Sequence, residues 1–385
     1  MLNFSFQNTT KIQFGEGQIK TLSQLIPKTA KVLVTYGGGS IKANGVYDQV
    51  AEALSEHTWF EFSGIEPNPT YDTLMKAEDL IRQHDIDFLL AVGGVSVVDG
   101  TKFIAAAALF EGDDPWDFVA RGQPIKQALP MACVLTLPAT GSESNANSVV
   151  TRDGNKLPFN SPLVQPLFAV LDPAVTLSLS DRQISNGVVD AFVHTIEQYL
   201  TYSVNGKVQD RFAEGLLLTL IEEGPKALAA ETKNDLDVRG NIMWAATMAL
   251  NGLIGAGVPQ DWATHMIGHE LTGAYAIDHA RTLSIVLPAV MKVCAKAKRE
   301  KLLQYAERIW NLTEGDDDSR INRAIELTER FFQTMQVPTR LSDIDLGKTE
   351  IDGLIEKLTQ HGMLKLGEHS DITPEISREI LNTAL

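Results

Sequence analysis

Buried strands and helices alternate through the first half of the chain, and this alternation constrains the fold more than any other feature. Apolar, β-branched segments read as strands, and apolar residues at helical spacing lie between them. The strand segments are residues 31–40, 87–94, 132–144 and 168–173, and the helical ones are 71–85 and 101–110. Near-continuous apolar strands separated by helices predict a parallel sheet with helices on both faces.

The pattern changes near residue 180. Ser180 and Gln183 form the sequence of a capping box, S-x-x-Q, and predict a helix that runs to about Tyr199. The later apolar segments all have a period of 3.6 residues, and none reads as a strand. We therefore expect an α/β domain over residues 1–179 and an all-helical domain over residues 180–385.

Composition excludes several classes of protein. The 385 residues carry a net charge of −16, and so acidic a surface disfavours nucleic acid, although a local basic pocket for one phosphate remains possible. The two cysteines exclude a disulfide framework and fit a reducing cytoplasm. The N-terminal segment lacks the pattern of a signal peptide, and the longest apolar run, residues 128–139, is far too short to span a membrane. We expect a cytoplasmic protein without a membrane or nucleic-acid partner.

Asp190 and His194 are four residues apart in the helix expected after Ser180, so both side chains project from one face. Carboxylate and neutral imidazole both bind zinc or ferrous iron. The spacing alone is typical of surface or capping pairs. However, the flanking residues are nearly all apolar, and a buried Asp and His need partners.

Three of the eight histidines lie within fifteen positions, at His265, His269 and His279. The metalloprotease motif H-E-x-x-H is absent, because Leu271, Thr272 and Gly273 follow Glu270. Each histidine by itself could be a hydrogen-bonded core residue. Together with Asp190 and His194, five candidate ligands on neighbouring apolar helices favour a metal site.

Glycine-rich turns follow two of the expected strands and suit a phosphate, although neither is the G-x-G-x-x-G fingerprint. They contain Gly37, Gly38, Gly39 and Ser40, and then Gly93, Gly94 and Ser96. A third loop adds the hydroxyls of Thr136 and Thr140. Loops from successive parallel strands lie along the carboxyl edge of a sheet, where ligands bind. No acid ends the first strand, and Gly39, Ser40 and Lys42 leave room and a positive charge for a 2′-phosphate.

Several motifs together resemble the iron-containing (group III) alcohol dehydrogenase family over essentially the whole chain. They are GGVSVVDGTK (93–102), LPATGSES (137–144), the pair Asp190/His194 and the three histidines of the later segment. The segments SGIEPNP, SNGVVDAFVHT and GAGVPQDWATHMIGHELT look closest to its NADPH-dependent aldehyde reductases and butanol dehydrogenases. The resemblance implies a Rossmann-like domain followed by a helical domain, the dehydroquinate synthase-like fold, with metal and nicotinamide meeting in the cleft between them.

The resemblance also implies a role for each candidate residue. Asp190, His194, His265 and His279 would hold the metal, while His269 would face the nicotinamide. Gly93, Gly94 and Ser96 would cradle the pyrophosphate with Asp99 nearby, and Gly37, Gly38, Gly39 and Ser40 would surround the adenosine ribose. Thr136, Thr140 and Asn145 match cofactor contacts of the third loop, and Lys156 matches a lysine near the nicotinamide ribose.

One position departs from the family pattern. Val95 stands where the family usually has a third glycine, and a β-branched residue is unfavourable at positive φ. Either this position has an ordinary φ, or cofactor binding is altered. We expect the first, because Ser96 and Asp99 are retained.

The resemblance implies reversible reduction of aldehydes to primary alcohols, with hydride from NADPH, NADP(H) as cofactor, and Fe²⁺ or Zn²⁺ polarising the carbonyl oxygen. Aldehyde and alcohol substrates and a homodimer are implied as well. One alternative is a lyase similar to dehydroquinate synthase. Its anionic substrate needs basic residues around the metal, and only Arg281 lies near the candidate ligands in sequence. A catalytically silent metal-binding protein is the other alternative, and the retained phosphate loops and Lys102 argue against it.

Overall fold

The computed structural model describes residues 1–385 and divides into two compact units. The α/β unit contains Gln7–Leu179 and Asn234–Thr247, and the helical unit contains Met1–Phe6, Ser180–Lys233 and Met248–Leu385. The chain thus passes from one unit to the other between Leu179 and Ser180, and one later segment returns to the α/β unit. None of the helices combines the length and the apolar character that crossing a membrane requires.

Six parallel strands form the sheet of the α/β unit, in the order β1-β8-β5-β4-β2-β3. The strands are β1 (Lys11–Phe14), β2 (Lys31–Thr35), β3 (Thr58–Phe62), β4 (Phe88–Gly94), β5 (Met131–Leu137) and β8 (Phe168–Leu171). The strands β6 (Asn147–Arg152) and β7 (Asn155–Asn160) form a separate antiparallel hairpin. The α/β class expected from the sequence is confirmed.

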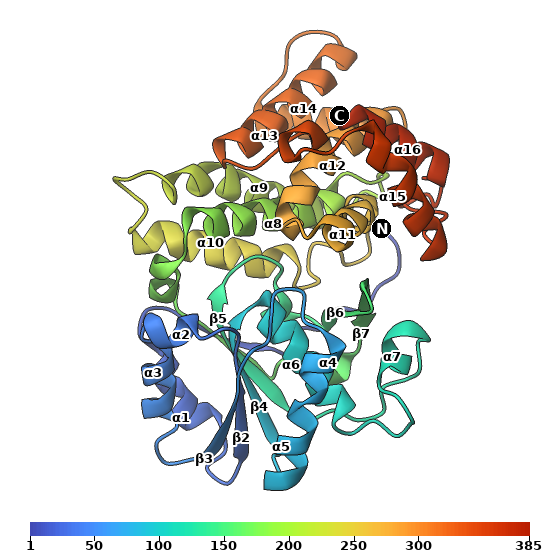
Figure 1. Ribbon diagram of the computed structural model, residues 1–385. Helices are drawn as coiled ribbons and strands as arrows, with labels where there is room; N and C mark the ends of the chain where they lie inside the picture. The colour runs from blue at the N-terminus through green and yellow to red at the C-terminus, as the bar shows by residue number, and fades with distance from the viewer. The chain divides into compact units, whose positions relative to one another are not determined.

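Helices cover both faces of this sheet (Figure 1). The helices of this unit are α1 (Leu22–Leu25), α2 (Ser40–Ala43), α3 (Val46–Ala53), α4 (Tyr71–Met75), α5 (Ala77–His84), α6 (Val95–Ala107) and α7 (Trp116–Ala120), with short 3₁₀ turns η1 (Gln18–Thr21), η2 (Ser142–Ser144), η3 (Pro162–Val164) and η4 (Pro173–Ser178). Helix α7 lies beside the hairpin strand β7 rather than on the sheet. Val34 and Leu90 pack toward α1 and α3, and Leu33 and Leu89 pack toward α5 and α6. Because alternate residues face opposite, equally buried sides, the strands are apolar throughout.

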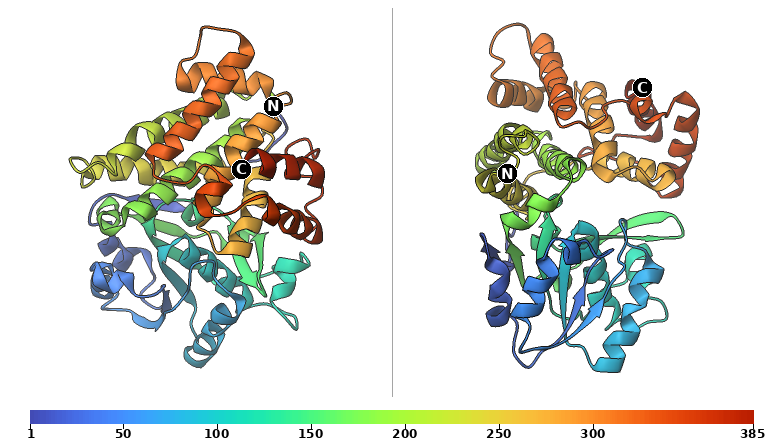
Figure 2. Two further views of the ribbon diagram at one scale, coloured as in Figure 1. Left: turned by 45° about the horizontal axis from the view of Figure 1, so that its top comes forward. Right: turned by 60° about the vertical axis from the view of Figure 1, so that its left-hand side comes forward.

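The helical unit follows β8 and contains no strand. Its helices are α8 (Asp181–Tyr199), α9 (Lys207–Lys226), α11 (Ala263–Tyr275), α12 (His279–Val293), α13 (Arg299–Trp310), α14 (Asp317–Thr334), the 3₁₀ turn η5 (Leu341–Ile344), α15 (Lys348–Gln360) and α16 (Pro374–Thr383). The chain folds back between α13 and α14, which lie side by side in Figure 2. A core formed by α11, α12, α15 and α16 includes Ile267, Leu271, Val286 and Leu354. The helical class expected for the second half is confirmed.

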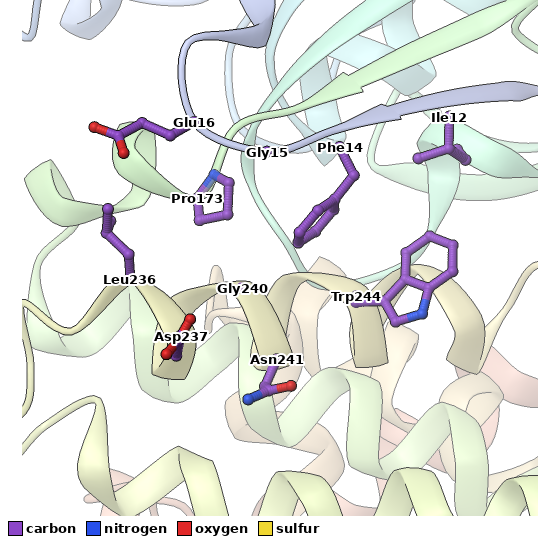
Figure 3. A pocket seen from close by; sticks show the side chains of 10 residues that line it. All are labelled: Ile12, Phe14, Gly15, Glu16, Pro173, Leu236, Asp237, Gly240, Asn241 and Trp244. Carbon is purple, nitrogen blue, oxygen red and sulfur yellow. The ribbon is translucent and has the colours of Figure 1, made fainter.

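Helix α10 (Leu236–Ala249) contributes most of its length to the α/β unit. A hollow of about 870 Å³ lies between this helix and β1 (Figure 3). Phe14 and Trp244 meet edge to face there, with ring centroids 6.0 Å apart. Its lining contains none of the residues that the sequence assigns to a metal or a cofactor.

Candidate metal centre and cofactor loops

Helix α8 carries the first two candidate ligands. Its N-terminus has the capping box that the sequence predicts: Gln183 N–H donates to Ser180 Oγ at 3.3 Å, and Ser180 N–H donates to Gln183 Oε1 at 3.1 Å. Asp190 and His194 follow on successive turns, both buried, with Asp190 Oδ1 at 3.3 Å from His194 Nδ1. The i, i+4 spacing thus brings carboxylate and imidazole together on the buried side of the helix.

Two further histidines approach Asp190 from neighbouring helices. His265 belongs to the first turn of α11, and His279 is the first residue of α12. The Nε2 atoms of both lie 3.9 Å from Asp190 Oδ1. One ligand atom each from Asp190, His265 and His279 fits within a mutual separation of 4.8 Å. Three helices therefore present metal-binding atoms to one point.

Several buried polar atoms at this point have no hydrogen-bond partner. They are Asp190 Oδ1, His194 Nδ1 and His265 Nε2. Burying a polar group without a partner costs free energy, and such groups in a native protein signal a missing ion or ligand. Burial also lowers the pKa of His194 to about 4, which keeps its imidazole neutral and able to bind a cation. The residues present therefore fit a divalent metal ion held by carboxylate and imidazole.

His194 and the fifth candidate, His269, lie outside the group formed by Asp190, His265 and His279. The ring centroid of His194 is 4.4 Å from that of His265. His269, one turn after His265 on α11, is only partly buried, and its ring centroid is 6.2 Å from His265 and 5.0 Å from His279. His269 thus borders the cluster from a more exposed position.

Glu197 is the functional candidate that sequence reasoning missed. It lies on α8, its side chain is 1% exposed, and one of its oxygens contacts His265 Nδ1. Burial alone would lower the pKa of His265, but the charges of Glu197 and Asp190 raise it to about 9. A signal was present in the sequence, because Asp190, His194 and Glu197 are spaced i, i+4, i+7 on one helical face.

The candidate cofactor loops all begin at neighbouring strands. In the order of the sheet, β2, β4 and β5 are adjacent, so their carboxyl ends bring the three loops together. Gly37, Gly38 and Gly39 lead from β2 to Ser40, the exposed first residue of α2. Gly93 and Gly94 end β4, and the 13-residue helix α6 follows directly with Ser96 in its first turn. The predicted juxtaposition of the loops is confirmed.

The glycine loops need their glycines for two different reasons. Gly39 has φ 98°, in the left-handed region that L-residues rarely adopt. Gly93 has an ordinary φ, but a Cβ atom there would come within 2.6 Å of the Val97 side chain. Val95 opens α6 and is not among the residues with positive φ. The expectation that this position tolerates an ordinary φ is therefore confirmed.

Asp99 faces into the protein from α6. Ser142 Oγ donates to one of its carboxylate oxygens at 2.5 Å, and Val149 N–H donates to the other at 2.9 Å. Lys102, fully buried one turn later, donates to Ser142 Oγ at 2.8 Å, Asn145 Oδ1 at 3.2 Å and Asn147 O at 2.6 Å. Burial lowers the pKa of Lys102 to about 8 and raises that of Asp99. These contacts hold the third loop against α6.

The other cofactor candidates lie on β5, in the loop that follows it, and on the hairpin strand β7. Thr136 is the penultimate residue of β5, and Thr140 Oγ1 accepts from Ser142 N–H at 3.3 Å. Asn145 is buried, and its amide donates to Gly141 O at 2.8 Å. Lys156 lies on β7. Asn145 therefore shapes the loop from inside, whereas Thr136 and Thr140 are partly exposed.

An acid lies beside the first glycine loop, although none ends β2. Glu61, on the neighbouring strand β3, accepts from Tyr36 Oη at 2.6 Å and from Lys42 Nζ at 3.3 Å. Tyr47 Oη donates to the same carboxylate. The positive charge of Lys42 is thus partly compensated by the Glu61 carboxylate, a contact that the sequence analysis did not predict.

Comparison with known proteins matches both halves of the chain to one family. The protein-family sequence model for iron-containing alcohol dehydrogenases matches residues 9–173. The family model for the C-terminal part of Fe-containing alcohol dehydrogenases matches residues 184–385. The NADPH-dependent aldehyde reductase YqhD of Escherichia coli (strain K12) is 59% identical over 100% of each chain. NADH-dependent butanol dehydrogenase A of Clostridium acetobutylicum is 35% identical over 99% of each.

Comparison with solved structures leads to the same family. The crystal structure of YqhD from E. coli K-12 has a TM-score of 0.98 at 59% identity and covers 100% of this chain and 99% of that one. NADH-dependent butanol dehydrogenase A from Thermotoga maritima has a TM-score of 0.94 at 35% identity, with the same two coverages. The resemblance inferred from the sequence is confirmed.

Proposed function

Because the chain belongs to the iron-containing alcohol dehydrogenase family, whose enzymes are NAD(P)-dependent oxidoreductases, we propose that it reduces aldehydes to primary alcohols reversibly. The observation that carries the proposal is the cluster of buried, unsatisfied donor atoms around Asp190. Asp190, His194, His265 and His279 would hold a divalent ion there. The E. coli relative at 59% identity is an aldehyde reductase, which supports the same substrate class.

When bound, the ion supplies Lewis-acid polarisation of a carbonyl oxygen, and the reduced nicotinamide supplies the hydride. The chain's own residues prepare the site for this chemistry. Asp190 brings a negative charge to the centre, and the neutral His194 adds a donor without adding charge. Burial of both excludes water and strengthens electrostatic interactions. His269 is partly exposed, so we assign it the exchange of a proton between the site and solvent.

We propose NADP(H) as the cofactor. Gly93, Gly94 and Ser96 at the N-terminus of α6 would receive the pyrophosphate, since amide groups and the helix dipole favour an anion. Ser40 and Lys42 would contact a 2′-phosphate. Glu61 would orient Lys42, but its own negative charge would oppose the negative charge of that phosphate. The names of the relatives include both NADPH and NADH, so the ratio of the two activities is the informative measurement.

Either Fe²⁺ or Zn²⁺ suits one carboxylate and three imidazoles. The decisive experiment measures oxidation of NADPH and of NADH with butanal, before and after chelation, together with elemental analysis of the protein. We expect aldehyde-dependent turnover with NADPH that chelation abolishes and added Fe²⁺ or Zn²⁺ restores. Absence of turnover with either cofactor at any metal loading would overturn the proposal. A clear preference for NADH would overturn the proposal of NADP(H) and the inference from Gly39, Ser40 and Lys42 on which it rests, but not the reaction.

We further propose a homodimer in the cytoplasm. The resemblance to the family supports the dimer, and the free state of Cys133 and Cys294 fits a reducing compartment. Light scattering after gel filtration should give twice the chain mass of 42.1 kDa. A single-chain mass at micromolar concentration would contradict the dimer, and recovery of the protein outside the cytoplasmic fraction would contradict the location.

A further inference from the structure

We propose that Glu197 is a positioning residue that selects the metal-binding tautomer of His265. The inference rests on the proposed metal centre and adds a residue outside its ligand set. Glu197 and His265 are 68 positions apart in the chain, on α8 and α11, and their side chains are 1% and 6% exposed. Contact between a buried carboxylate and a candidate ligand constrains where the imidazole proton lies.

Three donors converge on the Glu197 carboxylate. Oε1 accepts from Thr264 N–H at 2.7 Å and from His265 N–H at 3.3 Å, and Oε2 contacts His265 Nδ1. These two amides belong to the first turn of α11, whose N-cap residue, Trp262, makes no side-chain cap. Asp261 Oδ1 accepts locally from Ala263 N–H at 3.0 Å, and Glu197 supplies from α8 the acceptor for the next two amides. The carboxylate is held on both oxygens and has a defined orientation.

This orientation determines the chemistry of the imidazole. An ionised carboxylate has acceptors only, so His265 Nδ1 must carry the proton that it donates to Glu197. When a metal ion takes the place of the second ring proton, Nε2 therefore supplies the lone pair. Nε2 is the atom that lies 3.9 Å from Asp190 Oδ1 and has no hydrogen bond. Glu197 thus directs the metal-binding lone pair of His265 toward Asp190.

Glu197→Gln tests the joint role of this carboxylate, because glutamine has nearly the same size as glutamate but different hydrogen-bonding polarity. If its oxygen accepts from the two amides, its NH₂ group faces Nδ1 and drives the imidazole proton to Nε2, which removes the ligand lone pair. If the amide is flipped, two backbone N–H donors face an NH₂ group and α11 loses its cap. Neither orientation provides both the cap and the productive tautomer.

The test compares metal affinity in Glu197→Gln and wild type by competition with a chelator for Zn²⁺ and for Fe²⁺. We expect affinity to fall about 10- to 100-fold, the usual effect of losing an outer carboxylate partner. Glu214→Gln is the matched control. Glu214 is also a buried carboxylate of this unit, 7% exposed, but it bonds to Tyr199 and Arg308 rather than to a histidine. Its substitution should leave metal affinity unchanged.

Unchanged affinity in Glu197→Gln, or an equal loss in Glu214→Gln, would overturn the proposal. Should Glu197→Gln not fold, ¹⁵N-histidine NMR of the Zn²⁺-loaded wild type decides, with His265→Gln identifying the signal. We expect a proton on Nδ1 and metal on Nε2, and metal on Nδ1 would overturn the proposal. If the wild type binds neither metal, the proposed metal centre fails instead, so the two failures are distinguishable.

Discussion

His194 and His269 are expected to have different roles at the cluster around Asp190. His194 is buried beside Asp190, with Nδ1 unsatisfied, whereas His269 lies at the partly exposed margin. We expect His194→Ala to lose most of its bound metal, because a donor is removed from the centre. His269→Ala should keep its metal and lose activity by about 10²-fold or more, the usual scale for a proton-transferring group.

Metal content by elemental analysis and kcat for butanal reduction test the two variants in parallel. Circular dichroism of both variants checks that the helices remain. Loss of metal from His269→Ala would show that the assignment of ligand and neighbour is wrong.

Lys102 is expected to stabilise the α/β unit from its interior and to hold the third loop in position. Its ammonium joins α6 to Ser142, Asn145 and Asn147 of the third loop. Lys102→Met leaves these acceptors without their buried donor, so the free energy of unfolding should fall by at least about 2 kcal/mol. Binding of NADPH should weaken as the loop loses its position. Urea unfolding and calorimetric titration measure the two effects, and Lys20→Met, at an exposed position of the same unit, is the control. Equal stability of the two variants would contradict the prediction.

Among the helices, α8 has both a capping box that was predicted from the sequence and two of the proposed metal ligands. Ser180→Ala removes the side-chain acceptor of the capping box, which should lower the free energy of unfolding by about 1 kcal/mol. Ser180→Thr retains the hydroxyl and should cost less. Metal content should not change in either variant, because Asp190 lies more than two turns further along the helix. Thermal and urea unfolding test the stability, and metal loss in Ser180→Ala would contradict the separation of cap from site.

The elements that sequence reasoning missed are the weakly patterned ones. All four predicted strands are present, but β1 and β3 and the hairpin β6–β7 were not predicted. β1 and β3 are the two edges of the sheet and are only partly buried, so they lack the continuous apolar pattern of central strands. The helix expected over residues 71–85 is divided into α4 and α5 at Lys76. The regular spacing of apolar residues predicts a helix or strand because one or both of its faces are buried. Elements that are only partly buried have a weaker apolar pattern and are therefore harder to predict.

For the whole molecule, the two units should respond to different ligands. A metal that binds only the native helical unit stabilises it by RT ln(1 + [L]/Kd), about 2.7 kcal/mol when its free concentration is 100 times Kd. Hydrogen exchange followed by mass spectrometry should therefore slow in α8, α11 and the start of α12 when metal is added. NADPH should instead slow exchange in the loops after β2, β4 and β5. A chelator should reverse the effect of the metal. The assignment would be contradicted if the metal slowed exchange in the glycine loops but not in α8 and α11.

The amino-acid pattern alone predicts the alternation of strands and helices, the change to a helical pattern near residue 180, the glycine turns and the pairs of metal-binding side chains at i, i+4. These are local properties, set by the periods of helix and strand and by backbone hydrogen bonding within a few residues. The family resemblance alone assigned His265 and His279, rather than His269, to one metal with Asp190, and the tertiary structure shows that both approach it. Neither the local pattern nor the resemblance indicated that Glu197 contacts His265 or that Glu61 accompanies Lys42. Such contacts join residues far apart in the chain, and they depend on how packed helices and paired strands bring those residues together.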